Sequence, residues 1–248
     1  MPGFKFHKSN LENLGFKELS ENISLFASCI GKKIEDIGAL YFAPEEDASD
    51  DKITSINLAI NKLKNYRCSE FQTTVYDLTL FLDNKKITFS ITDRVLSMML
   101  FVGENVSLLQ NYNKNLEYFK SSKQDKQFKI PVEYYLLSAK QNPDLSNNFI
   151  NEMLGKKIVK AEILKIKPFE SKTNKDKYYS HLGEALATRY SEMFTGYCGV
   201  RFTFEEGMIR TIAVNGLSKA NFSSHINILA ESDVDYSRVI EIIDVKNK

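Results

Sequence analysis

The feature that most constrains the fold is a change in hydrophobic period from about 3.6 to 2, which begins near residue 71. Between residues 71 and 92, apolar and β-branched side chains alternate with polar ones in two runs, separated by the sequence Asp-Asn-Lys-Lys at 83–86. Strict alternation is typical of half-buried strands, and a short polar break between two such runs is typical of a hairpin. The sequence therefore predicts an antiparallel β-hairpin in the centre of the chain.

The C-terminal part of the chain shows the same alternation. Residues 200–204 and 209–214 flank a Glu-Glu-Gly turn, which predicts a second hairpin. Three further apolar runs are expected to be strands: 158–166, 225–229 and 238–245. Together these runs predict an antiparallel C-terminal sheet.

Other segments favour helices, because their apolar residues recur at intervals of three or four. In the N-terminal part the expected helices lie at 19–30 and 53–64. The later segments expected to be helical are 95–102, 131–140, 147–154 and 181–193. We therefore expect an α+β fold with N-terminal helices, a central β-hairpin, a helical basic middle and an antiparallel C-terminal sheet.

The length of the chain, 248 residues, is sufficient for one domain with a substantial core. We expect a single α+β domain over residues 1–248. The polar, asparagine-rich stretch 111–130 leaves a second organisation open, because such a stretch is typical of a linker or loop. It would then separate a helix-plus-hairpin part, 1–110, from a basic and helical part with the antiparallel sheet, 131–248.

The composition excludes several classes of protein. Hydrophobic residues make up 43% and charged residues 26% of the chain, which is typical of a globular protein. No apolar run approaches the roughly 18 residues of a membrane helix, and residues 1–10 lack the apolar region of a secretory signal. Cys29, Cys68 and Cys198 lie too far apart for a disulfide framework or a zinc motif. We expect a cytoplasmic chain with buried thiols, no membrane attachment and no metal or other cofactor.

The charge is unevenly distributed along the chain. Residues 114–177 carry 14 lysines and 8 acids (+6), whereas the first 113 residues carry 12 basic and 15 acidic residues (−3) and the last 71 carry 7 and 9 (−2). A positive middle between two acidic flanks indicates an anionic partner. Lysine outnumbers arginine 27 to 6 and there are 20 asparagines, a bias that an AT-rich coding sequence would also produce. Lysine attracts phosphate but reads bases poorly.

From this charge pattern we expect a non-enzymatic binding or assembly protein whose lysine-rich middle engages nucleic acid or an acidic protein. Two tyrosines follow the lysines and could stack on bases of a single strand. The expected nucleic-acid-binding residues are Lys120, Lys123, Lys126, Lys129, Lys156, Lys157, Lys160, Lys172, Lys175, Lys177, Tyr178 and Tyr179. The alternative is an ordinary solvated surface, since eight acids share the segment.

Motifs for catalysis are missing from the sequence. There is no Gly-x-Ser-x-Gly elbow, no P-loop and no dinucleotide-binding glycine pattern. A metal-dependent nuclease is the alternative function, with Asp144, Glu162 and Lys165 as candidate catalytic residues. The spacing of Glu162 and Lys165 would place them on opposite faces of a regular strand. A pure protein–protein scaffold subunit is the third hypothesis, because hairpins leave edge strands at which a homo- or hetero-oligomer could form.

Overall fold

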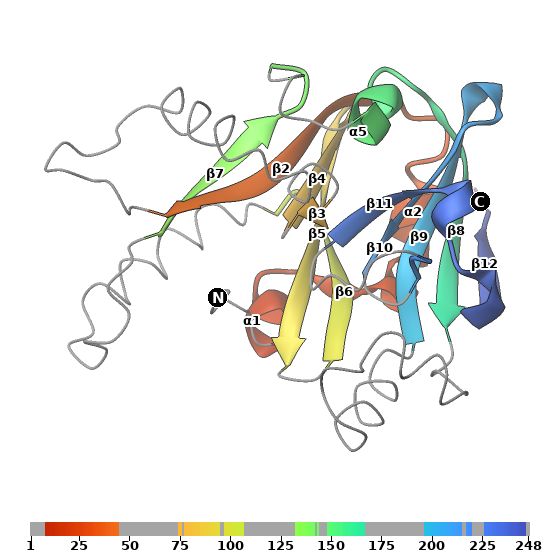
Figure 1. Cartoon of the computed structure of the whole chain (residues 1–248), viewed down its shortest axis with the longest axis horizontal. Helices are drawn as coiled ribbons and strands as arrows, with labels where there is room; N and C mark the ends of the chain where they lie inside the picture. Colours follow the sequence, from red (N-terminus) through yellow and green to blue (C-terminus); the bar gives the residue numbers. More distant parts are fainter. Residues whose placement is uncertain are drawn as a thin grey trace, which may run out of the picture.

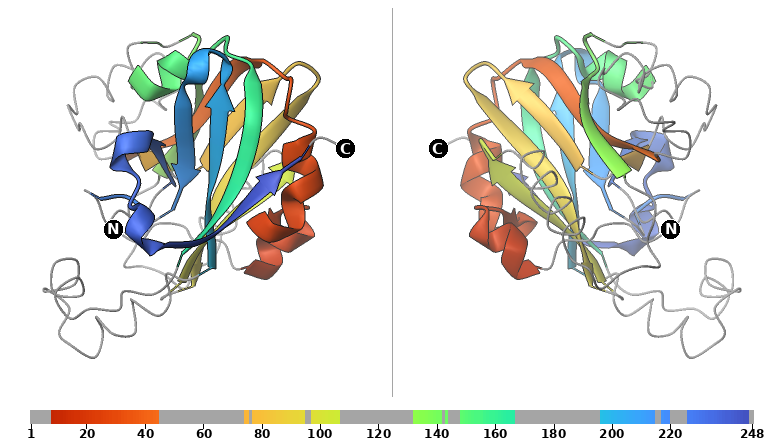
Figure 2. Two further views of the ribbon diagram at one scale, coloured as in Figure 1. Left: turned by 90° about the vertical axis from the view of Figure 1, so that its right-hand side faces the viewer. Right: turned by 90° about the vertical axis from the view of Figure 1, so that its left-hand side faces the viewer.

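The computed structural model describes residues 8–44, 74–75, 77–94, 97–106, 132–141, 143, 148–166, 196–214, 217–219 and 226–246. These residues form two antiparallel β-sheets that lie as two layers against each other (Figures 1 and 2). In each sheet, five longer strands are accompanied by one strand of two residues at an edge.

The first sheet has the strand order β1-β6-β5-β4-β2-β7, and all neighbours are antiparallel. Its strands are β1 (Lys17–Glu18), β2 (Ile34–Pro44), β4 (Asp77–Leu82), β5 (Lys85–Arg94), β6 (Ser97–Glu104) and β7 (Val132–Ser138). The pairing of Leu82 with Lys85 leaves a two-residue turn between β4 and β5, which confirms the predicted central hairpin. Beyond β4, β2 continues as a two-stranded ribbon with β7 (Figure 1).

The second sheet has the strand order β12-β8-β9-β10-β11-β3 and is also antiparallel throughout. Its strands are β3 (Thr74–Val75), β8 (Ile158–Ile166), β9 (Gly196–Phe204), β10 (Ile209–Ala213), β11 (Ile226–Ala230) and β12 (Val239–Val245). The predicted β9–β10 hairpin and the three further C-terminal strands are therefore confirmed. The observed bounds of β8 coincide with those expected from the sequence.

The described helices are short. They are α1 (Lys8–Asn13), α2 (Ile23–Ala27) and α5 (Asn148–Met153), with 3-10 turns η1 (Leu19–Asn22), η3 (Glu205–Gly207), η4 (Glu231–Asp233) and η5 (Tyr236–Arg238). None of these described helices is long and apolar enough to cross a membrane. The predicted α+β class with a helical middle is wrong, because the described chain is mostly antiparallel β-sheet.

Two expected helices account for most of this error. Residues 95–102 and 131–140 contribute the strands β6 and β7 instead of helices. Periodicity does not distinguish a short apolar helix from a buried strand, and here pairing with β5 and β2 decides the conformation. The expected helices at 53–64 and 181–193 and the possible linker 111–130 lie outside the described residues, so the single-domain expectation stays a prediction.

Side chains from both sheets share one hydrophobic core. Phe26 of α2 lies between the sheets, with ring centroids 6.3 Å from Phe89 of β5 and 6.1 Å from Phe202 of β9. The sheets are also joined by backbone hydrogen bonds at one corner, where Lys33 and Lys157 form an antiparallel bridge. The Ile34 amide there donates to the Lys156 carbonyl at 2.9 Å. This corner brings lysines from distant parts of the sequence together.

Candidate functional site

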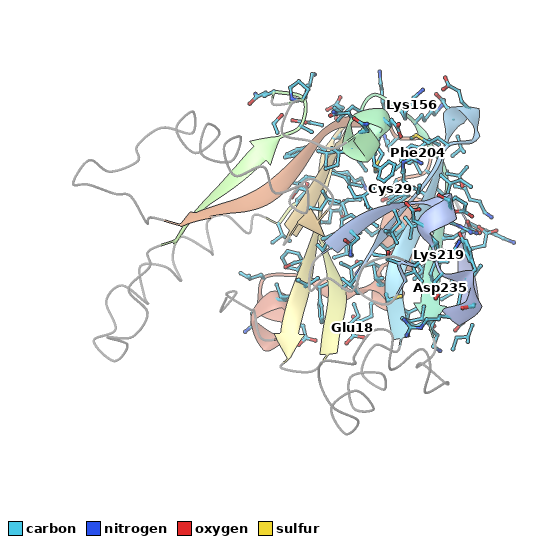
Figure 3. The ribbon with its side chains drawn as sticks, in the orientation of Figure 1. Glu18, Cys29, Lys156, Phe204, Lys219 and Asp235 are labelled. Carbon is cyan, nitrogen blue, oxygen red and sulfur yellow. The ribbon has the colours of Figure 1, made fainter. Side chains whose placement is uncertain are left out.

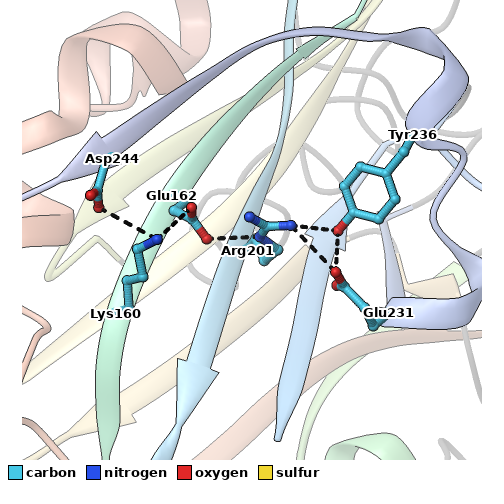
Figure 4. A network of polar contacts seen from close by, with 6 residues as sticks. All are labelled: Lys160, Glu162, Arg201, Glu231, Tyr236 and Asp244. Carbon is cyan, nitrogen blue, oxygen red and sulfur yellow. Dashed lines mark hydrogen bonds and ion pairs between the residues drawn. The ribbon is translucent and has the colours of Figure 1, made fainter. Parts of the chain in front are cut away.

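A network of charged side chains lies on the second sheet, on the face opposite the core (Figure 4). Ala161 and Ile163 of β8 are buried in the core, so Glu162 between them faces the other side of the sheet. Its carboxylate accepts from Lys160 Nζ at 2.7 Å and from Arg201 Nε at 2.8 Å. Both oxygens of Glu162 are therefore already held by cations.

The Arg201 guanidinium connects β9 to the η4–η5 segment that follows β11. Its Nη1 donates to the Tyr236 hydroxyl at 2.6 Å and reaches Glu231 Oε1 at 3.4 Å. The Tyr236 hydroxyl donates in turn to Glu231 at 2.7 Å. Arg201 also lies over the Tyr236 ring, 5.5 Å from its centroid. The network thus fastens the η4–η5 segment to the sheet.

Electrostatics keeps Glu162, Lys160 and Tyr236 each in one protonation state. Burial by itself would raise the pKa of Glu162, but hydrogen bonds from Arg201 and Lys160 outweigh it and hold that pKa below its usual value. The hydrogen bond to Glu162 raises the pKa of Lys160. Burial and the hydrogen bond to Glu231 raise the pKa of Tyr236 to about 12. None of these groups titrates near neutral pH, where a general acid or base would have to exchange its proton.

The described structure does not assemble the three candidate catalytic residues into a metal site. Glu162 has no carboxylate oxygen free of a cationic partner, and Asp144 lies outside the described residues. Lys165 pairs instead with Glu241 of β12, at 3.2 Å, and lies over the Tyr197 ring. The part of the chain that the structure describes contains no group of three His, Cys, Asp or Glu side chains that could hold a metal ion.

The described cysteines offer no reactive thiol. Cys29 and Cys198 are buried free thiols, as the sequence predicted, and Cys68 lies outside the described residues. Burial raises the pKa of both thiols to about 12. At neutral pH they are protonated and act as small core residues.

A second cluster of charges lies at the corner where the two sheets join. The chain contains three Lys-Lys dipeptides, and the backbone of all three lies at or next to this corner: Lys32–Lys33, Lys85–Lys86 and Lys156–Lys157. Ile87 belongs to the core, so Lys86 before it lies on the face of the first sheet that points away from the second sheet. The first and third are linked by the β-bridge described above. The second follows the β4–β5 turn, whose Asp83 accepts an ion pair from Lys32 at 3.5 Å. We call these six residues the lysine corner; Figure 3 labels Lys156 within it.

Four of the six corner lysines are paired with carboxylates. Besides the Lys32–Asp83 pair, Lys85 contacts Glu104 at 3.1 Å, Lys156 contacts Glu206 at 2.6 Å and Lys157 contacts Glu205 at 3.7 Å. Lys33 and Lys86 form no ion pair with another described residue. Most of these side chains remain accessible: Lys157 and Glu205 are about half exposed, and Glu206 is 76% exposed.

Only part of the predicted nucleic-acid-binding set belongs to this corner. Lys156 and Lys157 lie in it, whereas Lys160 is bound in the Glu162 network. The remaining predicted residues lie outside the described part of the chain: Lys120, Lys123, Lys126, Lys129, Lys172, Lys175, Lys177, Tyr178 and Tyr179. Lys32, Lys33, Lys85 and Lys86 are not among the residues predicted from the sequence, although the recurrence of the Lys-Lys dipeptide is a visible signal.

Comparison with protein-family models, curated proteins and solved structures finds no match for this chain. The function is therefore inferred from the geometry of the Glu162 network, of the lysine corner and of the sheet edges.

Proposed function

We propose that this chain is a non-enzymatic binding protein that holds the phosphate backbone of a nucleic acid at the lysine corner. The observation that carries the proposal is the convergence of three Lys-Lys dipeptides from remote segments on one corner of the molecule. Clustered cations attract a polyanion without any further recognition element.

The ion pairs at the corner are compatible with this role. Exposed lysine–carboxylate pairs typically contribute between about 0 and 1 kcal/mol, so a phosphate can replace Glu205 or Glu206 at little cost. Lys33 and Lys86 need no such exchange, because neither is engaged with another described carboxylate. These two lysines are the first places where a phosphate would bind.

Lysine side chains are expected to attract phosphate groups without recognising particular bases. Each corner cation is a lysine, a hydrated point charge, and none is an arginine, which reads guanine through two hydrogen bonds. We expect weak binding that depends on salt and discriminates poorly between base sequences. An acidic protein would bind to the same lysines. The experiment below distinguishes binding of an acidic protein from binding of a nucleic acid.

The test measures binding of labelled single-stranded and duplex oligonucleotides of two different sequences by fluorescence anisotropy, between about 50 and 200 mM salt. The double variant Lys33→Ala/Lys86→Ala should bind more weakly and show a slope of log K against log salt that is shallower by about 1.4 for single strands, about 0.7 for each phosphate that is no longer neutralised. The matched control is Lys17→Ala/Lys219→Ala, which removes two exposed lysines elsewhere on the molecule; Lys219 lies away from Lys156 in Figure 3.

An unchanged slope in the corner variant, or an equal change in the control, would overturn the assignment to this corner. If the wild-type protein binds no oligonucleotide at low salt but binds an acidic polypeptide such as polyglutamate, the nucleic-acid proposal fails and the acidic-protein alternative replaces it.

A further inference from the structure

The structure exposes four large apolar side chains among the described residues, two of them on β12, the last strand of the second sheet. They are Ile23 (41% exposed), Val159 (46%), Ile240 (55%) and Ile242 (44%). These residues belong to α2, β8 and β12, and β12 pairs with β8 and contacts α2. Figure 2 shows β12, in dark blue, at the border of its sheet beside α2. Ile240 and Ile242 therefore leave apolar surface exposed along β12 itself.

The strand β12 has one edge that no other described strand uses. It is the terminal strand of its sheet, and its only ladder among the described residues is with β8. Soluble proteins usually protect such edges with lysine, proline or charges that point outward. The sequence of β12, VIEIIDV, contains neither lysine nor proline.

The two acids of β12 do not protect this edge either. Glu241 is drawn to Lys165 at 3.2 Å, and Asp244 lies 4.0 Å from Lys160. Both lysines belong to β8, the strand on the occupied side of β12. A register shift between Val239 and Glu241 marks a bulge at Ile240, so the regular part of the edge begins at Glu241.

We infer that the edge of β12 left unpaired by the described residues pairs with β12 of a second copy of this chain, antiparallel and about a two-fold axis near Ile242. In this register Ile242 meets Ile242 of the second copy and Glu241 meets Ile243, whereas the bulge at Ile240 interrupts regular pairing beyond Glu241. Glu241 therefore faces an apolar side chain directly across the pair, and no like charges are directly opposed. A two-fold axis requires such self-complementarity, because the same patch serves both copies.

The resulting dimer joins the two copies of the second sheet into one continuous antiparallel sheet. Pairing satisfies the backbone groups of the free edge and covers the exposed isoleucines of β12. This inference does not depend on nucleic-acid binding, because the lysine corner and the β12 edge share no residue.

The test is the molar mass of the full chain over a range of concentrations, measured by sedimentation velocity and by size exclusion with light scattering. The wild-type protein should be a concentration-dependent dimer. Ile242→Lys places a charge at the centre of the edge and should shift the protein to monomer at every concentration measured. Val159→Lys is the matched control, since it adds the same charge to β8 outside the stretch that pairs with β12, and it should remain dimeric.

Circular dichroism and thermal unfolding establish that both variants are folded. A second variant, Ile242→Pro, removes the backbone N–H at the same position and should also be monomeric. A wild-type protein that stays monomeric at the highest concentration would overturn the inference. So would a folded Ile242→Lys variant that remains dimeric, or equal loss of the dimer in Val159→Lys.

Discussion

Replacement of Arg201 by methionine tests whether the charged network on the second sheet stabilises the fold through this one side chain. Methionine is unbranched and retains most of the volume of arginine, but it removes the charge and the donors. The variant leaves Glu162 with Lys160 as its sole cationic partner in the network, and it takes the arginine away from Tyr236 and Glu231. The Arg201 and Glu162 side chains are only 15% and 7% exposed, so water restores few of the interactions that arginine made.

The burial of these side chains sets the expected magnitude. Breaking a fully buried ion pair costs about 3–5 kcal/mol because one charge is left uncompensated. Here Lys160 continues to compensate Glu162, so we expect Arg201→Met to lower the free energy of unfolding by about 2–3 kcal/mol. Lys160 is 45% exposed, and Lys160→Met should therefore cost about 1 kcal/mol or less.

The assay is urea unfolding at neutral pH, followed by circular dichroism, on Arg201→Met, Lys160→Met, Glu162→Gln and the double variant Arg201→Met/Glu162→Gln. Neutralising Glu162 should cost less in the Arg201→Met background than in the wild type, with a coupling energy of about 1 kcal/mol or more. A larger loss in Lys160→Met than in Arg201→Met would refute the reasoning, as would strict additivity of Arg201→Met and Glu162→Gln.

Two further outcomes are expected from the same surface of the second sheet. The folded-state pKa of Glu162 is depressed, so its contribution to stability is present above the unfolded pKa of about 4.3 and is lost as the pH falls through the folded value. In Glu162→Gln the free energy of unfolding should therefore fall less steeply as the pH is lowered into the acidic range. An unchanged pH dependence would contradict this. A Cβ at Gly199 would lie 3.0 Å from Leu217 Cδ2 and 3.2 Å from Ala213 Cβ, so Gly199→Ala should lower the urea midpoint by the equivalent of about 1–3 kcal/mol. Leu217→Ala is itself destabilising because Leu217 is buried, but Gly199→Ala should cost less in the Leu217→Ala background than in the wild type if this close approach is the cause.

The elements that were predictable from the sequence are those whose pattern is local. Alternation with a short polar turn predicts the β4–β5 and β9–β10 hairpins, because both strands and their turn lie within about 20 consecutive residues. The strands β6 and β7 were not predictable in this way. Their sequences, SMMLFVGE and VEYYLLS, are apolar runs, and pairing with β5 and β2 decides between helix and strand.

The partners of the candidate site residues were likewise not predictable from local sequence patterns. Glu162 was singled out as a possible metal ligand, yet its actual partner, Arg201, is 39 residues away in sequence, and only the β8–β9 register brings the two together. The three Lys-Lys dipeptides were equally visible in the sequence. Their convergence depends on the bridge between Lys33 and Lys157, which joins two segments with no local signal for pairing.

This convergence changes what the charge of the chain implies about binding. An excess of +6 over residues 114–177 suggests a strongly cationic surface, but Lys156, Lys157, Lys160 and Lys165 of that stretch are all engaged with carboxylates. A paired lysine releases fewer counterions on binding a phosphate, because its carboxylate must first be displaced and rehydrated. If Lys33 and Lys86 are the effective cations, the salt slope for single strands should be near 1.4 in magnitude, that is, about 0.7 for each of two phosphates. A much steeper slope would mean that phosphates displace the carboxylates or that other lysines of the stretch 114–177 take part.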